Sequence, residues 1–176
     1  MKEYVDVLID EAKIEKKLQE LAAQIDRDFH GEEIALVCVL KGGAVTLVHL
    51  AKYLKSPVTM DFLSASSYGN GVKSSGDVQI RLDLTNGIEG KNVLLVEDIV
   101  DSGRTLAKLR EMFLERNPKS FRICTLLDKP DGRVVDVPVD YVGFEIPDAF
   151  VVGFGLDFAQ KYRNLGYIGV VHFEEE

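Results

Sequence analysis

The chain has 176 residues, which is enough to bury the core of one domain. It is 46% hydrophobic and 28% charged with a net charge of −8, and it has neither a long basic run nor an apolar stretch of membrane-spanning length. No nucleic-acid or membrane partner is therefore expected, and the two cysteines indicate reduced, buried thiols in a cytoplasmic protein rather than a disulfide or a metal pair.

Helical and strand-like patterns alternate along the chain. In order, they predict a helix between Asp10 and Gly31, a strand over 33–40, a helix over about 45–54, strands over 57–64, 78–84 and 92–97, a helix over about 103–116, and strands over 120–127, 140–144, 150–154 and 167–171. This alternation predicts an α/β fold with a mainly parallel sheet. No linker or internal repeat divides the chain, so we expect one domain over residues 1–176.

Polar clusters follow three of the predicted strands, at 41–43, 97–105 and 128–129. In sheets of this kind, ligands bind beyond the carboxyl ends of the strands. The segment 66–77 is different, because it is rich in Ser and Gly and has few apolar side chains that could anchor it. We expect it to be a mobile loop.

Residues 93–105 read VLLVEDIVDSGRT and carry the strongest functional signal. An apolar strand leads to Glu97 and Asp98, and then to a turn that opens a helix. The first N–H groups of a helix and its positive dipole end suit a phosphate, whereas the two acids suit ribose hydroxyls or a metal. Helix capping would explain one small polar residue in the turn, but not Gly103, Thr105 and the acid pair together.

The segment resembles the signature of type I phosphoribosyltransferases, which use 5-phosphoribosyl-1-pyrophosphate (PRPP), and the resemblance extends from about residue 5 to residue 171. It implies a twisted, mainly parallel sheet flanked by helices. It also implies a small hood built from the N-terminal and C-terminal segments, and a flexible lid over about 65–77.

The resemblance also assigns roles within the signature. Ser102, Gly103, Arg104 and Thr105 would bind the 5′-phosphate, and Glu97 and Asp98 would face the ribose hydroxyls directly or through Mg²⁺. In the purine-specific members, the residue that matches Asp101 lies near the purine N7 and is the candidate general acid/base.

Three further segments match the pyrophosphate side of the family's site. Lys41 and Gly42 would bind pyrophosphate, often beside a cis peptide at Leu40–Lys41, which a sequence cannot show. Asp157 would bind Mg²⁺ and Arg163 would contact pyrophosphate, although a surface ion pair is an alternative interpretation of these two residues. Ser67 and Tyr68 would belong to the lid, although such a loop is most often a plain surface loop.

Lys129, Phe150 and Val151 resemble the purine pocket of the members that act on hypoxanthine and guanine, and Ile99 would pack on the other face of the base. Taken alone, Lys129 reads as an exposed strand-end lysine and Phe150 as a core residue. An ammonium donor suits the 6-oxo group of these bases, whereas adenine offers an amino group at that position.

The resemblance therefore implies transfer of a phosphoribosyl group from PRPP to N9 of hypoxanthine, and of guanine, with Mg²⁺ as cofactor. A xanthine-preferring enzyme is one alternative. A PRPP-sensing regulator that binds nucleic acid is another, which the acidic charge disfavours. A homo-oligomer, either dimer or tetramer, is expected on the family resemblance alone.

Overall fold

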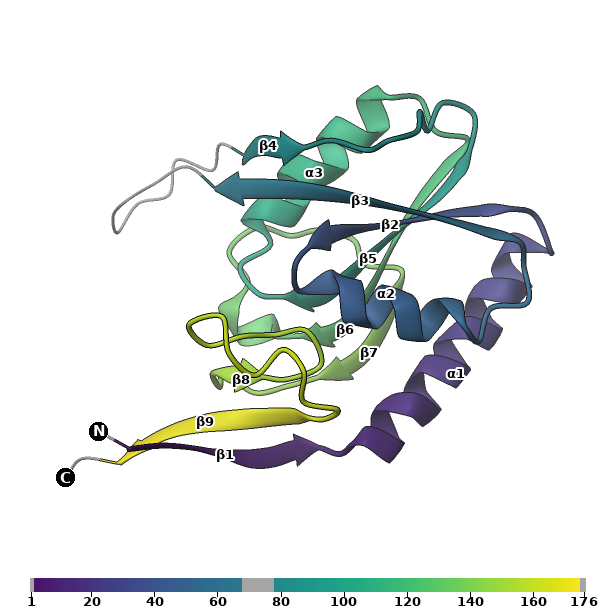
Figure 1. The fold of residues 1–176 in the computed structure, drawn as a ribbon. Coiled ribbons are helices and arrows are strands. Elements are labelled where there is room, and N and C mark those ends of the chain that lie inside the picture. Colours follow the sequence, from purple (N-terminus) through teal and green to yellow (C-terminus); the bar gives the residue numbers. More distant parts are fainter. Residues whose placement is uncertain (1, 68–77, 175–176) are drawn as a thin grey trace.

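The computed structural model describes residues 2–67 and 78–174 (Figure 1). Its elements in chain order are β1 (Lys2–Ile9), α1 (Glu11–Phe29), β2 (Ile34–Leu40), α2 (Gly43–Ala51), β3 (Val58–Ser67), β4 (Val78–Leu82), β5 (Asn92–Val100), α3 (Arg104–Glu115), β6 (Ser120–Asp128), a 3-10 turn (Pro130–Gly132), β7 (Tyr141–Glu145), β8 (Val151–Val152) and β9 (Ile168–Glu174).

A six-stranded sheet in the order β4-β3-β2-β5-β6-β7 forms the centre of the structure. All neighbouring pairs are parallel except β3 and β4, so β4 is an antiparallel edge strand. The central strands β2 and β5 are buried along most of their length, as expected for parallel strands that are covered on both faces. The predicted α/β class and the mainly parallel sheet are confirmed.

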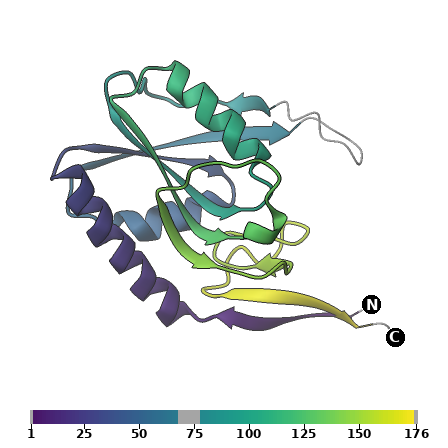
Figure 2. The same ribbon diagram turned by 180° about the vertical axis from the view of Figure 1, so that it is seen from behind.

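Helices cover both faces of this sheet (Figures 1 and 2). On one face, α1 and α2 enclose a core that includes Ile14, Leu18 and Leu47, whereas α3 packs on the opposite face through Leu109 and Phe113. Both cysteines are buried and free, as the sequence indicates. No helix in the described part of the chain is both long and apolar enough to cross a membrane.

Local sequence signals set the limits of α1 as predicted. The Asp10 carboxylate accepts a hydrogen bond from the backbone N–H of Lys13 at 2.8 Å, which is the bond of an N-cap. The helix ends where His30 and Gly31 adopt positive φ angles of 52° and 78°. Glycine adopts such an angle without steric cost, which explains the end of the helix.

A second, three-stranded sheet in the order β1-β9-β8 lies below the first in Figure 1, and we call it the terminal sheet. The sequence pattern did not predict β1. Its apolar side chains Tyr4, Val7 and Leu8 are exposed, so no single buried face marks the strand. The strand is instead defined by antiparallel pairing with β9, from Lys2 opposite Glu174 to Ile9 opposite Ile168, a partner that local propensity cannot indicate.

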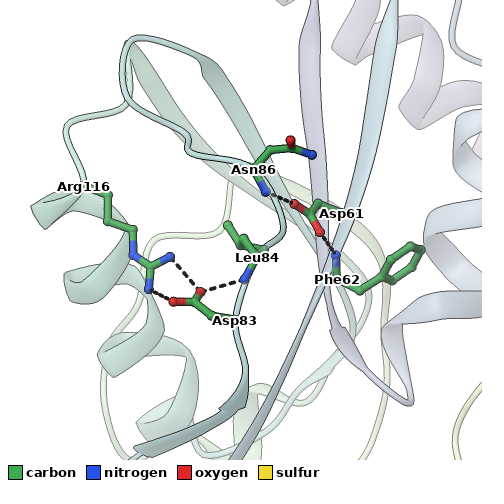
Figure 3. Close-up of polar contacts among 6 residues, drawn as sticks. All are labelled: Asp61, Phe62, Asp83, Leu84, Asn86 and Arg116. Carbon is green, nitrogen blue, oxygen red and sulfur yellow. Dashed lines mark hydrogen bonds and ion pairs between the residues drawn. The ribbon is translucent and has the colours of Figure 1, made fainter.

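Two carboxylates anchor the segment that joins β4 to β5 (Figure 3). Asp61 on β3 accepts a hydrogen bond from the backbone N–H of Asn86 at 2.9 Å. Asp83 accepts two from Arg116 at the end of α3, at 2.8 and 3.0 Å. Burial alone would raise the pKa of Asp61, but hydrogen bonds from backbone N–H groups lower it below the ordinary value.

We expect Asp61→Ala to lower the free energy of unfolding by about 1–3 kcal/mol, because it removes acceptors from backbone N–H groups. Asp83→Ala breaks an exposed ion pair instead, and should cost less than about 1 kcal/mol. Since the pKa of Asp61 is depressed on folding, the effect of Asp61→Ala should be complete well above the ordinary value of 3.8 and should shrink as the pH falls below it. Urea unfolding at several pH values measures both effects, and equal losses would contradict the distinction.

Candidate functional site

The predicted polar clusters meet at one edge of the six-stranded sheet. Strands β2, β5 and β6 are mutually parallel neighbours, so the segments that follow their carboxyl ends lie together. These segments are 41–43 after β2, 101–105 after β5, which we call the phosphate turn, and 129–135 after β6. The strand β5 continues through the acid pair to Val100, three residues beyond its predicted end.

Gly103 is the N-cap of α3 and adopts a left-handed conformation with φ 81°. No side chain caps the helix, although the Ser102 hydroxyl accepts a hydrogen bond from the backbone N–H of Arg104 at 3.4 Å. Apart from that of Arg104, the first N–H groups of α3 are not taken up by a capping side chain. Arg104 and Thr105 are exposed in this first turn. The arrangement suits an anion such as a phosphate group.

The segment after β6 braces the phosphate turn from behind, a contact that sequence reasoning missed. The carbonyl oxygen of Ser102 accepts hydrogen bonds from the N–H groups of Val134 and Val135 at 2.9 and 3.0 Å. Arg133 donates from Nε to the carbonyl oxygen of Asp101 at 3.0 Å. A Cβ atom at Gly103 would lie only 2.4 Å from the carbonyl oxygen of Val135, so only glycine fits this position.

A cavity of about 220 Å³ opens between Glu97 and the phosphate turn, and Asp98 is not part of its lining. Its lining residues are Val39, Glu97, Ile99, Val100, Asp101, Ser102, Gly103, Thr105 and Leu106. The structure thus brings together most of the residues that the sequence predicts for the phosphoribosyl group. Ile99, predicted to contact a base, lines the same cavity.

Glu97 and Asp98 are partly buried neighbours with no described ion-pair partner in range of their oxygens. Burial and the adjacent Asp98 carboxyl raise the pKa of Glu97 well above its usual range. Burial and the charge of Asp157 raise the pKa of Asp98. The hydrogen bond from the N–H of Ile99 and the charge of Arg163 lower it, but the net shift is upward. Positive charge, or a hydrogen-bond donor such as a sugar hydroxyl, would stabilise the ionised pair.

Gly42 packs directly against Asp98, because a Cβ atom at this position would lie 1.9 Å from Asp98 Oδ2. On its other side, the carbonyl oxygen of Gly42 lies so close to Gly155 that a Cβ atom there would be 2.2 Å away. Gly155 has φ 100°, so both its conformation and its packing require glycine. The peptide bond between Leu40 and Lys41 is cis.

Lys41, Asp157, Gln160 and Arg163 form a second group, which we call the cationic cluster. Arg163 pairs with Asp157 at 2.8 Å. It also donates to the carbonyl oxygen of Gly155 at 2.7 Å and to the Gln160 side chain at 3.2 Å. Lys41 donates to the same Gln160 oxygen at 3.1 Å. The cluster therefore joins the loop after β2 to the loop before β9, and Gln160 was not predicted.

Lys129 is buried, with 8% of its surface exposed, so the interpretation of an exposed strand-end lysine is wrong. Its ammonium lies 2.9 Å from Asp148 Oδ1 and 3.6 Å from Asp101 Oδ2. Burial alone would lower the pKa of Lys129, but the hydrogen bond to Asp148 and the charges of both aspartates raise it. The Lys129 ammonium is therefore held between Asp148 and Asp101. Asp148 is a partner that the sequence did not indicate.

Phe150 is 53% exposed, so the interpretation of this residue as core is also wrong. Its ring contacts that of Phe158 edge to face, with centroids 5.7 Å apart. Val151 follows as the first, buried residue of β8. An exposed aromatic face is available for stacking, which suits a flat heterocycle. Neither Phe150 nor Lys129 lines the cavity described above.

Of the two predicted lid residues, the structure describes only Ser67. Ser67 is the last residue of β3, and its backbone pairs with Val78 on β4. Tyr68 lies outside the described residues, together with the rest of the segment up to 77.

The acidic side chains fit a metal that is shared with a phosphate ligand better than a metal held by protein alone. Within residues 2–67 and 78–174, no group of three or more His, Cys, Asp or Glu side chains could hold an ion. Mg²⁺ usually keeps several waters and binds through one or two carboxylates together with phosphate oxygens. Asp98 and Asp157 offer such carboxylates, and the charge of Asp157 already raises the pKa of Asp98.

Comparisons with known proteins show which family this chain resembles. The sequence matches the family model of the phosphoribosyl transferase domain over residues 5–159. It is 50% identical to a hypoxanthine phosphoribosyltransferase of Salmonella typhimurium, over 100% of both chains. It is also 50% identical to a hypoxanthine-guanine phosphoribosyltransferase of Bacillus subtilis, over 94% of this chain and 92% of that one. The crystal structure of a hypoxanthine-guanine phosphoribosyltransferase from Bacillus anthracis gives a TM-score of 0.92 at 47% identity, covering 98% of this chain and 100% of the other.

Proposed function

This chain belongs to the phosphoribosyltransferase family, and from that premise we propose that it is a purine-salvage enzyme. It transfers the 5-phosphoribosyl group of PRPP to N9 of hypoxanthine, and of guanine, and yields the nucleoside 5′-monophosphate and pyrophosphate. The relatives named for this activity are about half identical to it along nearly their whole length. The fold is that of the type I enzymes of the family.

One observation carries the proposal beyond family membership. The ammonium of Lys129 and the carboxylate of Asp101 lie 3.6 Å apart beside the phosphate turn, on the β5–β6 side of the site. A 6-oxopurine presents an acceptor at O6 and a proton-exchanging nitrogen at N7, so it fits a cation donor next to a carboxylate. In this proposal Phe150 stacks on the base, the backbone of Val151 meets its edge, and Ile99 packs against the other face.

The phosphoribosyl group occupies the cavity of the phosphate turn in this proposal. The backbone N–H groups of 102–105 and the hydroxyls of Ser102 and Thr105 hold the 5′-phosphate, while Glu97 and Asp98 face the ribose hydroxyls. As the bond from C1 to pyrophosphate breaks, positive charge develops on the sugar. As N9 bonds to C1, the Asp101 carboxylate accepts the proton that leaves the purine N7.

The departing pyrophosphate is bound by the cationic cluster. Lys41, Arg163 and the backbone at Gly42 supply donors for its negative charge. Asp98 and Asp157, with Glu97 adjacent, are the residues that would hold Mg²⁺. When bound, Mg²⁺ would neutralise charge on the pyrophosphate oxygens.

Lys129→Met tests how the base is recognised. It removes a cationic hydrogen-bond donor while keeping a long side chain, so kcat/KM for hypoxanthine should fall by about 10- to 100-fold, as expected for loss of a hydrogen bond with a charged partner. The preference for hypoxanthine over adenine should narrow, whereas KM for PRPP should stay within about threefold. Lys161→Met, at an exposed lysine, is the matched control. A loss that is equal for PRPP and base would contradict this role of Lys129.

The assay that tests the function itself offers hypoxanthine, guanine, xanthine and adenine separately, with PRPP and Mg²⁺. Formation of inosinate and guanylate with little product from adenine is the expected result. A dominant product from xanthine would replace the proposal with a xanthine-preferring enzyme. No product from any base, with PRPP still bound, would indicate a PRPP sensor, and binding to DNA or RNA would then be measured.

We also propose a cytoplasmic location and a homo-oligomeric state, either dimer or tetramer. The two free, buried cysteines support a reducing compartment. The oligomeric state rests on family resemblance. Light scattering coupled to size-exclusion chromatography tests it, and a monomer at micromolar concentration would contradict it.

A further inference from the structure

Gln160 lies where the two cations of the cationic cluster meet. Its side-chain Oε1 accepts a hydrogen bond from Lys41 Nζ at 3.1 Å and another from Arg163 at 3.2 Å. Lys41 and Gln160 are 119 residues apart in the sequence, so one amide oxygen connects the loop after β2 to the loop before β9.

The rest of Gln160 is oriented by Asp157. The backbone N–H of Gln160 donates to Asp157 Oδ2 at 2.8 Å, and its side-chain Nε2 lies 3.4 Å from the same oxygen. Lysine and arginine offer only donors, whereas an ionised aspartate offers only acceptors. A neutral amide, with an acceptor at one end and a donor at the other, is the group that satisfies both sides.

The backbone also holds Gln160 in place. Its φ angle is 67°, in the left-handed region that few residues other than glycine adopt. The turn around it is closed by two backbone hydrogen bonds between Phe158 and Lys161, of 3.1 and 2.9 Å. The amide is thus presented by a defined turn rather than by a free side chain.

We propose that Gln160 is a positioning residue that fixes Lys41 and Arg163 for the pyrophosphate end of PRPP, an inference that rests on the proposed function. Two converging cations repel each other, and both carry long side chains that lose much rotational freedom when they bind a ligand. A shared acceptor offsets the repulsion and orders both side chains beforehand. Each cation retains further N–H donors for phosphate oxygens, so Gln160 acts in the free and the ligand-bound states.

Gln160→Met tests this role, because methionine keeps the length of the side chain and removes the shared acceptor. We expect KM for PRPP and the Kd for magnesium pyrophosphate, measured by calorimetry, to rise by about 5- to 10-fold, because two side chains must then be ordered on binding. KM for hypoxanthine and the Tm should not change. Gln19→Met makes the same chemical change on an exposed position of α1 and should alter none of these values.

Two results would overturn the proposal. One is wild-type affinity of Gln160→Met for both PRPP and pyrophosphate. The other is a rise in the hypoxanthine KM together with the PRPP KM and a lower Tm, which would make Gln160 a structural part of its turn. The pyrophosphate titration needs no turnover, so it separates this inference from the proposed function, which is tested by the nucleotides that the wild-type chain forms from the four bases.

Discussion

Asp101→Asn is expected to lower kcat by about 10²- to 10⁴-fold, the usual contribution of general acid/base catalysis, while the Kd for PRPP stays within about threefold. Asparagine keeps the size of the side chain and an oxygen that can accept from Lys129, which lies 3.6 Å from the carboxylate. It cannot take up or deliver a proton at the purine N7. The substitution therefore isolates proton transfer from the packing of the site.

Two measurements together decide the outcome. Single-turnover rates report the chemical step, and calorimetry reports PRPP binding. Asp131→Asn, at an exposed carboxylate in the neighbouring 3-10 turn, is the matched control and should retain full activity. Equal losses of turnover and PRPP affinity in Asp101→Asn would assign Asp101 to substrate binding instead.

Gly103→Ala should weaken PRPP binding by about 10- to 100-fold, because it combines backbone strain with a steric clash. The residue has φ 81°, and its new Cβ atom would lie 2.4 Å from the carbonyl oxygen of Val135 and 3.0 Å from the Arg133 side chain. The phosphate turn would have to move away from residues 133–135, which hold it by hydrogen bonds. The N–H groups that would hold the 5′-phosphate would then lose their alignment.

Two other glycines provide controls that separate the steric clash from the backbone strain. Gly87→Ala meets no atom within 4 Å and has no positive φ angle, so it should leave both binding and stability unchanged. Gly31→Ala also meets no atom, but its φ is 78°, so it should lower stability through strain without affecting PRPP. Titration of each variant with PRPP, together with thermal unfolding, completes the comparison. Normal PRPP affinity in Gly103→Ala would show that the turn tolerates displacement.

The sequence was informative where function and local structure coincide. The run from Val93 to Thr105 predicts a strand, an acid pair and a helix start, and these features require one another: the strand places the acids, and the glycine turn opens the helix. The structure has all three in place. The predicted strand-end clusters also meet at one edge, because that follows from a parallel sheet.

What could not be predicted depends on contacts between distant segments. From the local sequence alone, Lys129 was expected to be exposed. Its partners Asp101 and Asp148 come together with it only in the fold. The brace at Arg133 to Val135 has no local pattern, since its contacts are to backbone atoms of another loop. The link from Gln160 to Lys41 spans 119 residues. Local propensity carries no information on such pairs.

The pairing of β1 with β9 has a consequence for the order in which the chain folds during its synthesis. Among the described residues, β1 pairs only with β9, which comes more than 150 residues later in the chain, and Lys2 lies opposite Glu174. Domains can begin to fold during synthesis, but β1 must wait until β9 has been translated. The strands of the six-stranded sheet and the phosphate turn all precede β9 in the chain, so the 5′-phosphate end of the site can form before the terminal sheet does.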